Sequence, residues 1–274
     1  RRTVKPTMPK YSEIEYWEQR YLDLPEPFDW LVAYKDVQVA LAALIPDKAT
    51  PILVIGCGNA NLSSDMHSDG YTNQINIDLC KNVIAAQKER YPDMDWRVMD
   101  VLDLKFEDEK DFAVVLDKSM IDTLLCGEGA EEKVLAMFRE ALRVLKPGGL
   151  YLGWSLHTVQ EVCALAGRLA KDAEWSFTTA RIPNPAFRDE PSPKRAVAHT
   201  FFACRKPMAS GERPEAPTIL GALTDGEFVG LLEARDQLAR QETLRLISGL
   251  QKKKRRATEP NSNQLLGNCK ERFW

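Results

Sequence analysis

Two closely spaced glycines in the first third of the chain could bring a backbone into direct contact with a ligand. Gly56 and Gly58 follow the apolar run at residues 52–55, and a helix is expected to begin near Asn61. Glycine lacks the Cβ atom that would collide with a ligand, and the positive N-terminal end of a helix attracts an anionic group. The pattern predicts a ligand-binding loop between a strand and a helix, although an ordinary tight turn is compatible with the same residues.

Two aspartates beyond this loop have the chemistry to select a nucleoside. Asp78 ends the next β-rich run, 20 positions after Gly58, where its carboxylate can accept hydrogen bonds from both hydroxyls of a ribose. Asp100 ends the third run and can accept a hydrogen bond from the exocyclic amine of adenine. An enzyme that binds a dinucleotide would use Asp78 in the same way, and a solvated turn is the alternative for Asp100.

The segments that must position these residues alternate between strand and helix. Strands are expected at residues 52–55, 73–78, 95–99, 112–117 and 150–155, and helices at 80–91 and 131–145. Such alternation is typical of a doubly wound parallel sheet. Two further β-rich runs, 175–182 and 198–205, succeed each other after a helix at 158–169. We therefore expect a Rossmann-like, doubly wound α/β fold with a seven-stranded sheet and an antiparallel terminal hairpin.

Flanking segments precede and follow the predicted sheet. A helix at residues 13–21, with Ser12 as its N-cap, and a second helix at 34–44 come first. An interrupted apolar stripe at 225–250 predicts one more helix, and the basic run at 252–256 is expected to be ordered only by a partner. The expected division is an N-terminal helical lid segment at 1–33, the main domain at 34–206, and a linker, helix and basic tail at 207–274.

One segment in the second half of the chain is more specific than the glycine loop. Residues 141–151 read Ala-Leu-Arg-Val-Leu-Lys-Pro-Gly-Gly-Leu-Tyr. This stretch resembles the helix, Pro-Gly-Gly turn and fifth strand of class I, seven-strand methyltransferases, and the resemblance covers residues 11–206. It implies that the ligand is the methyl donor S-adenosyl-L-methionine.

Three further motifs indicate a branch of that family. Residues 15–21 read Glu-Tyr-Trp-Glu-Gln-Arg-Tyr, residues 28–30 read Phe-Asp-Trp, and residues 116–124 read Leu-Asp-Lys-Ser-Met-Ile-Asp-Thr-Leu. Together they resemble the methyltransferase-like enzymes that modify lysines of translation elongation factor 1-alpha. The Gly-Cys-Gly-Asn loop also matches that branch, in which a third glycine is absent. Ser119 departs from the pattern, because these relatives usually carry glycine there, and this leaves the acceptor open.

The resemblance implies a set of residues around the cofactor. Carried over one by one, these are Trp17, Tyr21, Trp30, Gly56, Asp78, Leu79, Asp100, Val101 and Lys118, and the loop argument adds Gly58. The three aromatic side chains suit this role because aromatic faces attract a cation such as a sulfonium. The alternatives are a hydrophobic staple for the aromatic residues and a solvent-exposed strand end for the lysine.

The reaction implied by the resemblance is an in-line attack of an amine on the methyl carbon of the donor. A lysine has a pKa of about 10.4 in water, so it must lose a proton before it attacks. Asp117 and Asp122 are the catalytic candidates, because a carboxylate can steer an ammonium group or relay its proton, although either can instead cap the following helix. The Asn/Asp-Pro-Pro-Tyr/Phe motif is absent, which argues against methylation of an amide or of adenine.

Composition excludes some classes of function. The net charge of −3 and the sequence pI of about 5.8 give no global basic field, so nucleic acid is not the expected partner. Six cysteines without a Cys-x-x-Cys pair, and three scattered histidines, predict reduced thiols and no metal site. No apolar run approaches the roughly 18 residues of a membrane span. A soluble, cytoplasmic protein is expected; the basic start Arg1-Arg2 leaves an organelle, after presequence removal, as the alternative.

Three functions remain open at this point. Methylation of a protein lysine, in a translation factor for example, is the first. The second is a methyltransferase-like subunit with a structural role in a larger protein assembly, suggested by the tail after residue 207. A methyltransferase for a small molecule is the third.

Overall fold

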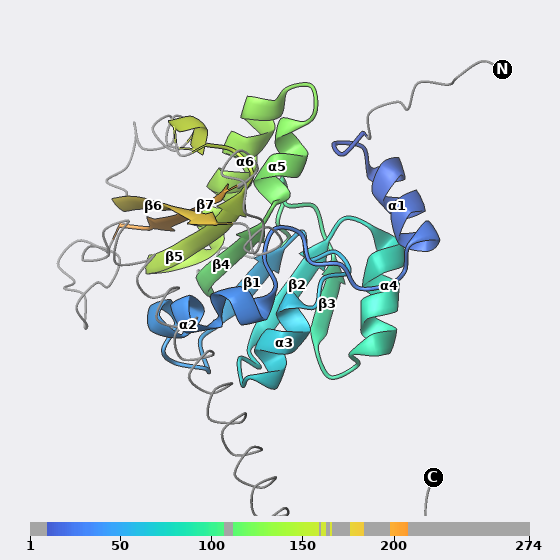
Figure 1. The fold of residues 1–274 in the computed structure, drawn as a ribbon, viewed down its shortest axis with the longest axis horizontal. Helices are drawn as coiled ribbons and strands as arrows, with labels where there is room; N and C mark the ends of the chain where they lie inside the picture. The colour runs from blue at the N-terminus through green and yellow to red at the C-terminus, as the bar shows by residue number, and fades with distance from the viewer. Residues whose placement is uncertain are drawn as a thin grey trace, which may run out of the picture. The chain divides into compact units, whose positions relative to one another are not determined.

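The computed structural model describes residues 10–106, 112–158, 160–162, 165, 176–183 and 198–207. These residues form a seven-stranded sheet with the strand order β3-β2-β1-β4-β5-β7-β6 (Figure 1). The strands are β1 Ile52–Ile55, β2 Gln74–Asp78, β3 Asp95–Val98, β4 Phe112–Lys118, β5 Leu145–Ser155, β6 Ser176–Pro183 and β7 Ala198–Arg205. The strands from β1 to β5 pair in parallel, and β7 pairs antiparallel with both β5 and β6. The predicted doubly wound sheet and its terminal hairpin are confirmed.

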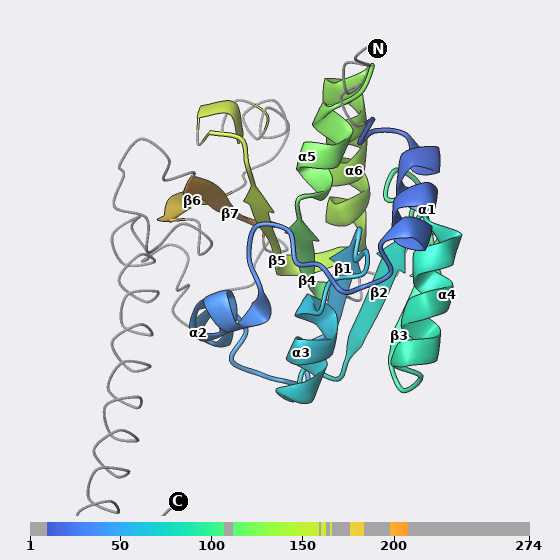
Figure 2. The ribbon, with the colours of Figure 1, turned by 45° about the vertical axis from the view of Figure 1, so that its right-hand side comes forward.

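Helices cover the sheet on both faces. They are α1 Ile14–Asp23, α2 Tyr34–Leu44, α3 Leu62–Ser68, α4 Lys81–Arg90, α5 Met120–Leu125 and α6 Ala130–Val144. One hydrophobic core joins the sheet to α2, α3 and α4, and a second joins it to α5 and α6 (Figure 2). Along β1, Ile52 and Val54 belong to the first core while Leu53 and Ile55 belong to the second. The unbroken apolar run of this strand is therefore explained by burial on both faces.

The Pro-Gly-Gly segment differs from its prediction. We expected a turn before a strand at residue 150, but β5 already begins at Leu145 and contains the segment as a bulge. Phe112 pairs with Leu145 whereas Val114 pairs with Leu150, so the extra residues lie on β5. Gly148 has a φ of 73°, a left-handed conformation that favours glycine.

Other predictions differ locally or fall outside the described residues. Helix α1 begins at Ile14 after Glu13, without a capping hydrogen bond from a side chain, so the predicted Ser12 cap is wrong. The short helix α5 was not predicted. Most of the predicted helix 158–169, and all of 208–274 with its predicted helix and basic run, lie outside the described residues. Within the described part of the chain, no helix has the length and apolar character needed to cross a membrane.

The packing of β5 on β7 gives a test of the fold. A Cβ atom on Gly153 would lie 2.1 Å from Cζ of Phe202, its partner on β7. We expect Gly153→Ala to lower the free energy of unfolding by about 1–3 kcal/mol through overpacking, measured by urea denaturation. Phe202→Leu removes the ring atoms that would clash, so Gly153→Ala should cost less in that background. An unchanged unfolding midpoint for Gly153→Ala would contradict this packing.

Candidate functional site

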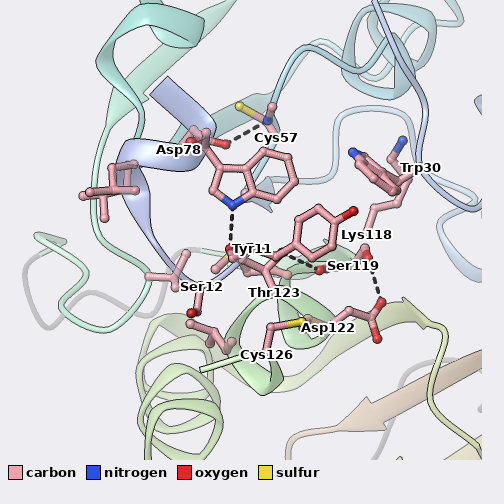
Figure 3. A pocket seen from close by; sticks show the side chains of 18 of the residues that line it. Tyr11, Ser12, Trp30, Cys57, Asp78, Lys118, Ser119, Asp122, Thr123 and Cys126 are labelled. Carbon is pink, nitrogen blue, oxygen red and sulfur yellow. Dashed lines mark hydrogen bonds between the residues drawn. The ribbon is translucent and has the colours of Figure 1, made fainter. Parts of the chain in front are cut away.

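A cavity of about 470 Å³ opens where the carboxyl ends of the parallel strands meet helix α1 (Figure 3). Residues that follow β1, β2, β3 and β4 contribute to its wall, as expected for an open α/β sheet. Eleven of the twelve predicted site residues line this cavity, namely Trp17, Tyr21, Trp30, Gly56, Gly58, Asp78, Leu79, Asp100, Val101, Lys118 and Asp122. The twelfth, Asp117, does not.

The glycine loop requires glycine for both conformation and space. Gly56 and Gly58 have φ angles of 58° and 53°, in the left-handed region. A Cβ atom on Gly56 would lie 2.7 Å from Sδ of Met120, and one on Gly58 would lie 2.6 Å from Oη of Tyr21. Side chains from α5 and α1 therefore lie against this loop, and any larger residue there would displace them.

Asp78 and Asp100 present carboxylate oxygens that the backbone holds in place. Oδ2 of Asp78 accepts a hydrogen bond from the Gly58 N–H, and Oδ1 accepts one from the Cys80 N–H, both at 2.9 Å. Burial raises the pKa of Asp78. Oδ1 of Asp100 accepts a hydrogen bond from the Leu102 N–H at 2.9 Å, which closes a turn after β3. Each carboxylate keeps lone pairs for a further donor, since each oxygen can accept more than one hydrogen bond.

An aromatic wall lies beside the glycine loop at the cavity. It consists of Tyr11, Trp17, Tyr21, Phe28 and Trp30, which all line the cavity. The Trp17 ring stacks on Tyr21 with centroids 5.8 Å apart and meets Trp30 edge-on at 6.1 Å. Helix α1 has no buried residue. A hydrophobic staple alone therefore does not account for these rings, because they pack on one another beside the cavity.

Two contacts place this wall. The indole N–H of Trp17 donates to the Tyr11 carbonyl at 2.6 Å, and the Glu18 carboxylate accepts a hydrogen bond from the Lys81 N–H at the start of α4, at 2.8 Å. Tyr11 was not predicted as a site residue. The sequence did contain an indication of this role, because an aromatic residue six positions before Trp17 can fold back onto the same wall.

Lys118 is not the exposed strand end that was its alternative. Its side chain is 7% exposed and its Nζ lies 2.6 Å from Oδ1 of Asp29, which is 16% exposed. Burial lowers the pKa of Lys118, and the Asp29 charge opposes this shift. Oδ2 of Asp29 also accepts a hydrogen bond from the Asn61 N–H at 3.4 Å. Asp29, which sequence reasoning missed within the Phe-Asp-Trp motif, thus ties residues 28–30 to β4 and to the start of α3.

The two catalytic candidates occupy different environments. Asp117 is fully buried and accepts hydrogen bonds from the N–H groups of Met120 and Ile121, at 2.7 and 3.3 Å, and from the Tyr151 hydroxyl at 2.7 Å. Burial raises the pKa of Asp117 to about 7. Its carboxylate therefore holds the first turn of α5. It does not line the cavity, and Tyr151, to which it is hydrogen-bonded, belongs to the second core.

Asp122 lies at the cavity beside a histidine that was not predicted as a site residue. Its carboxylate accepts hydrogen bonds from the Ser119 and Ser155 hydroxyls, both at 2.6 Å, and lies 2.8 Å from Nδ1 of His157. Burial alone would raise its pKa, but these hydrogen bonds outweigh burial and lower it. His157 lines the same cavity. A histidine two residues after β5 was the available signal, but the carboxylate beside it is 35 positions away in sequence.

Ser119 combines a hydrogen bond with a strained backbone, and this gives a second test. Its φ is 72°, which costs about 1–2 kcal/mol in a residue other than glycine, and its hydroxyl donates to Asp122. We expect Ser119→Ala to lower the free energy of unfolding by about 1–3 kcal/mol because it loses the charged hydrogen bond.

Ser119→Gly loses the same hydrogen bond but relieves the strain. It should therefore be about 1 kcal/mol more stable than Ser119→Ala in urea denaturation. Equal stability of the two variants, or a less stable glycine variant, would show that this backbone is not strained.

Comparisons with known proteins agree with this architecture. Residues 53–153 match the family described as methyltransferase domain. The human eEF1A lysine and N-terminal methyltransferase is 33% identical over 184 residues, covering 64% of this chain and 26% of that protein. The mouse EEF1A lysine methyltransferase 4 is 33% identical over 157 residues, covering 52% of this chain and 60% of that protein. This chain therefore spans between a quarter and three fifths of the length of these two relatives.

Solved structures share the fold at low sequence identity. Phosphoethanolamine N-methyltransferase 1 of Haemonchus contortus, in complex with phosphoethanolamine and S-adenosylhomocysteine, has a TM-score of 0.53 and 14% identity over 87% of this chain and 56% of that one. The [4+2]-cyclase SpnF also has a TM-score of 0.53 and 14% identity, over 76% of this chain and all of that one. The predicted resemblance to class I methyltransferases is confirmed.

Proposed function

We propose that this chain, which carries a class I methyltransferase domain, transfers a methyl group from S-adenosyl-L-methionine to an amine of a protein. The observation that supports this is the convergence of the glycine loop, Asp78, Asp100 and the aromatic wall on one cavity. Its volume of about 470 Å³ is within the range of about 300–1,000 Å³ that is typical of small-molecule sites.

The residues around the cavity fit S-adenosyl-L-methionine. Gly56 and Gly58 carry no side chain, so a ligand in the cavity could approach their backbone beside Met120 and Tyr21. Asp78 would accept hydrogen bonds from the ribose hydroxyls, and Asp100 would accept one from the exocyclic amine of adenine. Leu79 and Val101 follow these acids and offer apolar surface to a flat base. Lys118, already paired with Asp29, would act mainly by holding the aromatic residues 28–30 beside the ligand.

The chemistry depends on the placement of the acceptor amine. Bound S-adenosyl-L-methionine supplies an electrophilic methyl group on a sulfonium. The aromatic wall would attract the sulfonium cation and help to exclude water. Desolvation beside that positive charge would then lower the pKa of a substrate lysine, and the cavity would orient its amine. The negative charge of Asp122 lies on the same cavity and attracts the incoming ammonium group. Asp117 does not line the cavity and would therefore not act on the acceptor.

The acceptor that we propose is a protein lysine. Both relatives named above are described as lysine methyltransferases of eEF1A, a translation factor. The human one is also described as an N-terminal methyltransferase. A lysine of a translation factor is therefore the first target to test, and it would place the reaction in the cytoplasm. The fold does not decide this, since a [4+2]-cyclase shares it.

Cofactor binding tests the role of Asp78. Asp78→Asn should weaken the binding of S-adenosylhomocysteine about 10- to 100-fold in calorimetry, because a charge-assisted hydrogen bond contributes about 1.5–3 kcal/mol. Asp103→Asn is the matched control, since Asp103 is 64% exposed and does not line the cavity. Equal affinities of the two variants for S-adenosylhomocysteine would show that Asp78 does not bind the cofactor.

Methyl transfer tests the proposed activity. The purified chain, incubated with a methyl-tritiated donor and a cell extract, should label a polypeptide, and hydrolysis should release methylated lysine. The Asp78→Asn variant should label it more weakly. Label only in small molecules would support a metabolite substrate instead, and failure to bind S-adenosylhomocysteine would favour a structural subunit of a larger assembly.

A further inference from the structure

A substrate lysine raises a question that the proposed reaction leaves open, namely which group accepts its proton. An ammonium group has no lone pair, so it cannot attack the methyl carbon until one proton has left it. The acceptor must be on the cavity wall and must be able to bind a proton near neutral pH.

Asp122 is a poor acceptor because its carboxylate is already saturated with donors. Oδ1 accepts hydrogen bonds from the Ser155 hydroxyl at 2.6 Å and from the Leu156 N–H at 3.1 Å, and lies 2.8 Å from His157 Nδ1. Oδ2 accepts one from the Ser119 hydroxyl at 2.6 Å and one from the Leu156 N–H at 3.2 Å. The side chain is only 11% exposed. These donors stabilise the ionised form, which therefore does not readily take a proton.

Other cavity groups are also unsuited. The Cys126 thiol donates to the Asp122 carbonyl at 3.2 Å, and burial raises its pKa. Burial likewise raises the pKa of Tyr11 and Tyr21, so both phenols stay protonated at neutral pH. Glu13 lies at the cavity but forms an exposed ion pair with Lys10 at 2.7 Å.

His157 has the geometry that these groups lack. Its Nδ1 lies 2.8 Å from Asp122, which fixes Nδ1 as the protonated nitrogen and leaves the lone pair on Nε2. Its side chain is 30% exposed and lines the cavity, and within the described part of the chain no hydrogen bond reaches Nε2. The backbone is held as well, since the His157 N–H donates to Ser155 Oγ at 3.0 Å and its carbonyl accepts from Thr200 Oγ1 at 2.6 Å.

We propose that Nε2 of His157 accepts the proton of the substrate ammonium group, and that Asp122 is the positioning residue that orients the imidazole. This inference rests on the proposed function. The lone pair of Nε2 takes one proton from the ammonium, which leaves a neutral amine and an imidazolium beside the Asp122 carboxylate. The amine lone pair then forms the N–C bond to the methyl carbon while the C–S bond breaks and its electrons stay on sulfur. The imidazolium afterwards loses its proton to solvent.

The charges around His157 suit a base that works near neutral pH. Its hydrogen bond to Asp122 raises the pKa of His157 above the ordinary value, burial opposes the rise, and the charge of Glu161 adds to it. Lys133 of α6 lines the same cavity. On the neighbouring strand β7, burial lowers the pKa of His199, so that ring stays neutral. Because the imidazole must be neutral to accept a proton, the rate should fall as the pH drops through the raised pKa.

The test compares His157→Gln with His67→Gln, a matched change on α3 that lies away from the cavity. Initial rates of methyl incorporation into polypeptides of a cell extract are measured between about pH 6 and 9. His157→Gln should be slower by about 10²- to 10⁴-fold and should lose the inflection that the wild type shows above about pH 6.5. Its affinity for S-adenosylhomocysteine, measured by calorimetry, should stay within about threefold, because an intact cofactor site shows that the variant is folded.

Two outcomes of this assay distinguish failure of the proton-acceptor role from failure of the proposed function. If the wild type labels a polypeptide and His157→Gln retains its rate and pH profile, the proton-acceptor role is overturned while the proposed function stands. If the wild type binds S-adenosylhomocysteine but labels no polypeptide, the proposed function fails and this inference with it.

A second measurement is nitrogen NMR of the wild type, with the His157 signal assigned by its loss in His157→Gln. It should show the Nδ1–H tautomer of His157 and a pKa of its imidazole above about 6.5. The opposite tautomer, or a pKa below that value, overturns the inference.

Discussion

The ion pair between Lys118 and Asp29 connects the two halves of the site. Helix α1 has no fully buried residue, and of the aromatic wall only Tyr21 packs against the first core. Asp29 bridges Lys118 at the end of β4 and the Asn61 N–H before α3, and Trp30 comes next in the chain. Removing one member of such a buried pair leaves an uncompensated charge, which costs about 3–5 kcal/mol. The pair therefore constrains both the wall and the strand end that it faces.

The same region concentrates backbone strain. Leu31 and Ser119 are the described residues other than glycine with a positive φ, and they flank this ion pair in sequence. Conformations of this kind persist only where the surrounding contacts determine them. Around Ser119 those contacts are its hydroxyl's bond to Asp122 and its N–H bond to the Trp154 carbonyl at 3.0 Å. The strained turn brings Asp122 to the cavity while Asp117, five positions earlier, stays in the core.

The geometry of the sheet explains why proteins that share this fold can catalyse different reactions. Parallel strands bring their carboxyl ends to one edge, so any ligand of this fold binds there. One side of the cavity is built from these strand ends, with Gly58 hydrogen-bonded to Asp78. The other side, where we propose that the acceptor binds, contains Asp122 and His157, which belong to α5 and to the residues after β5. Differences between proteins of this fold are expected mainly on that second side.

The sequence by itself determined the strand order along the chain, the glycine loop and eleven of the residues that line the cavity, because burial and backbone conformation leave local patterns. The run at 52–55 is apolar throughout since both its faces are buried, and the positive φ of Gly56 and Gly58 demands glycine. Only the tertiary structure decided which polar groups meet. Lys118 and Asp29 are 89 positions apart, and Asp122 and His157 are 35 apart. No local pattern records such a pairing, because it depends on where the whole sheet places each side chain.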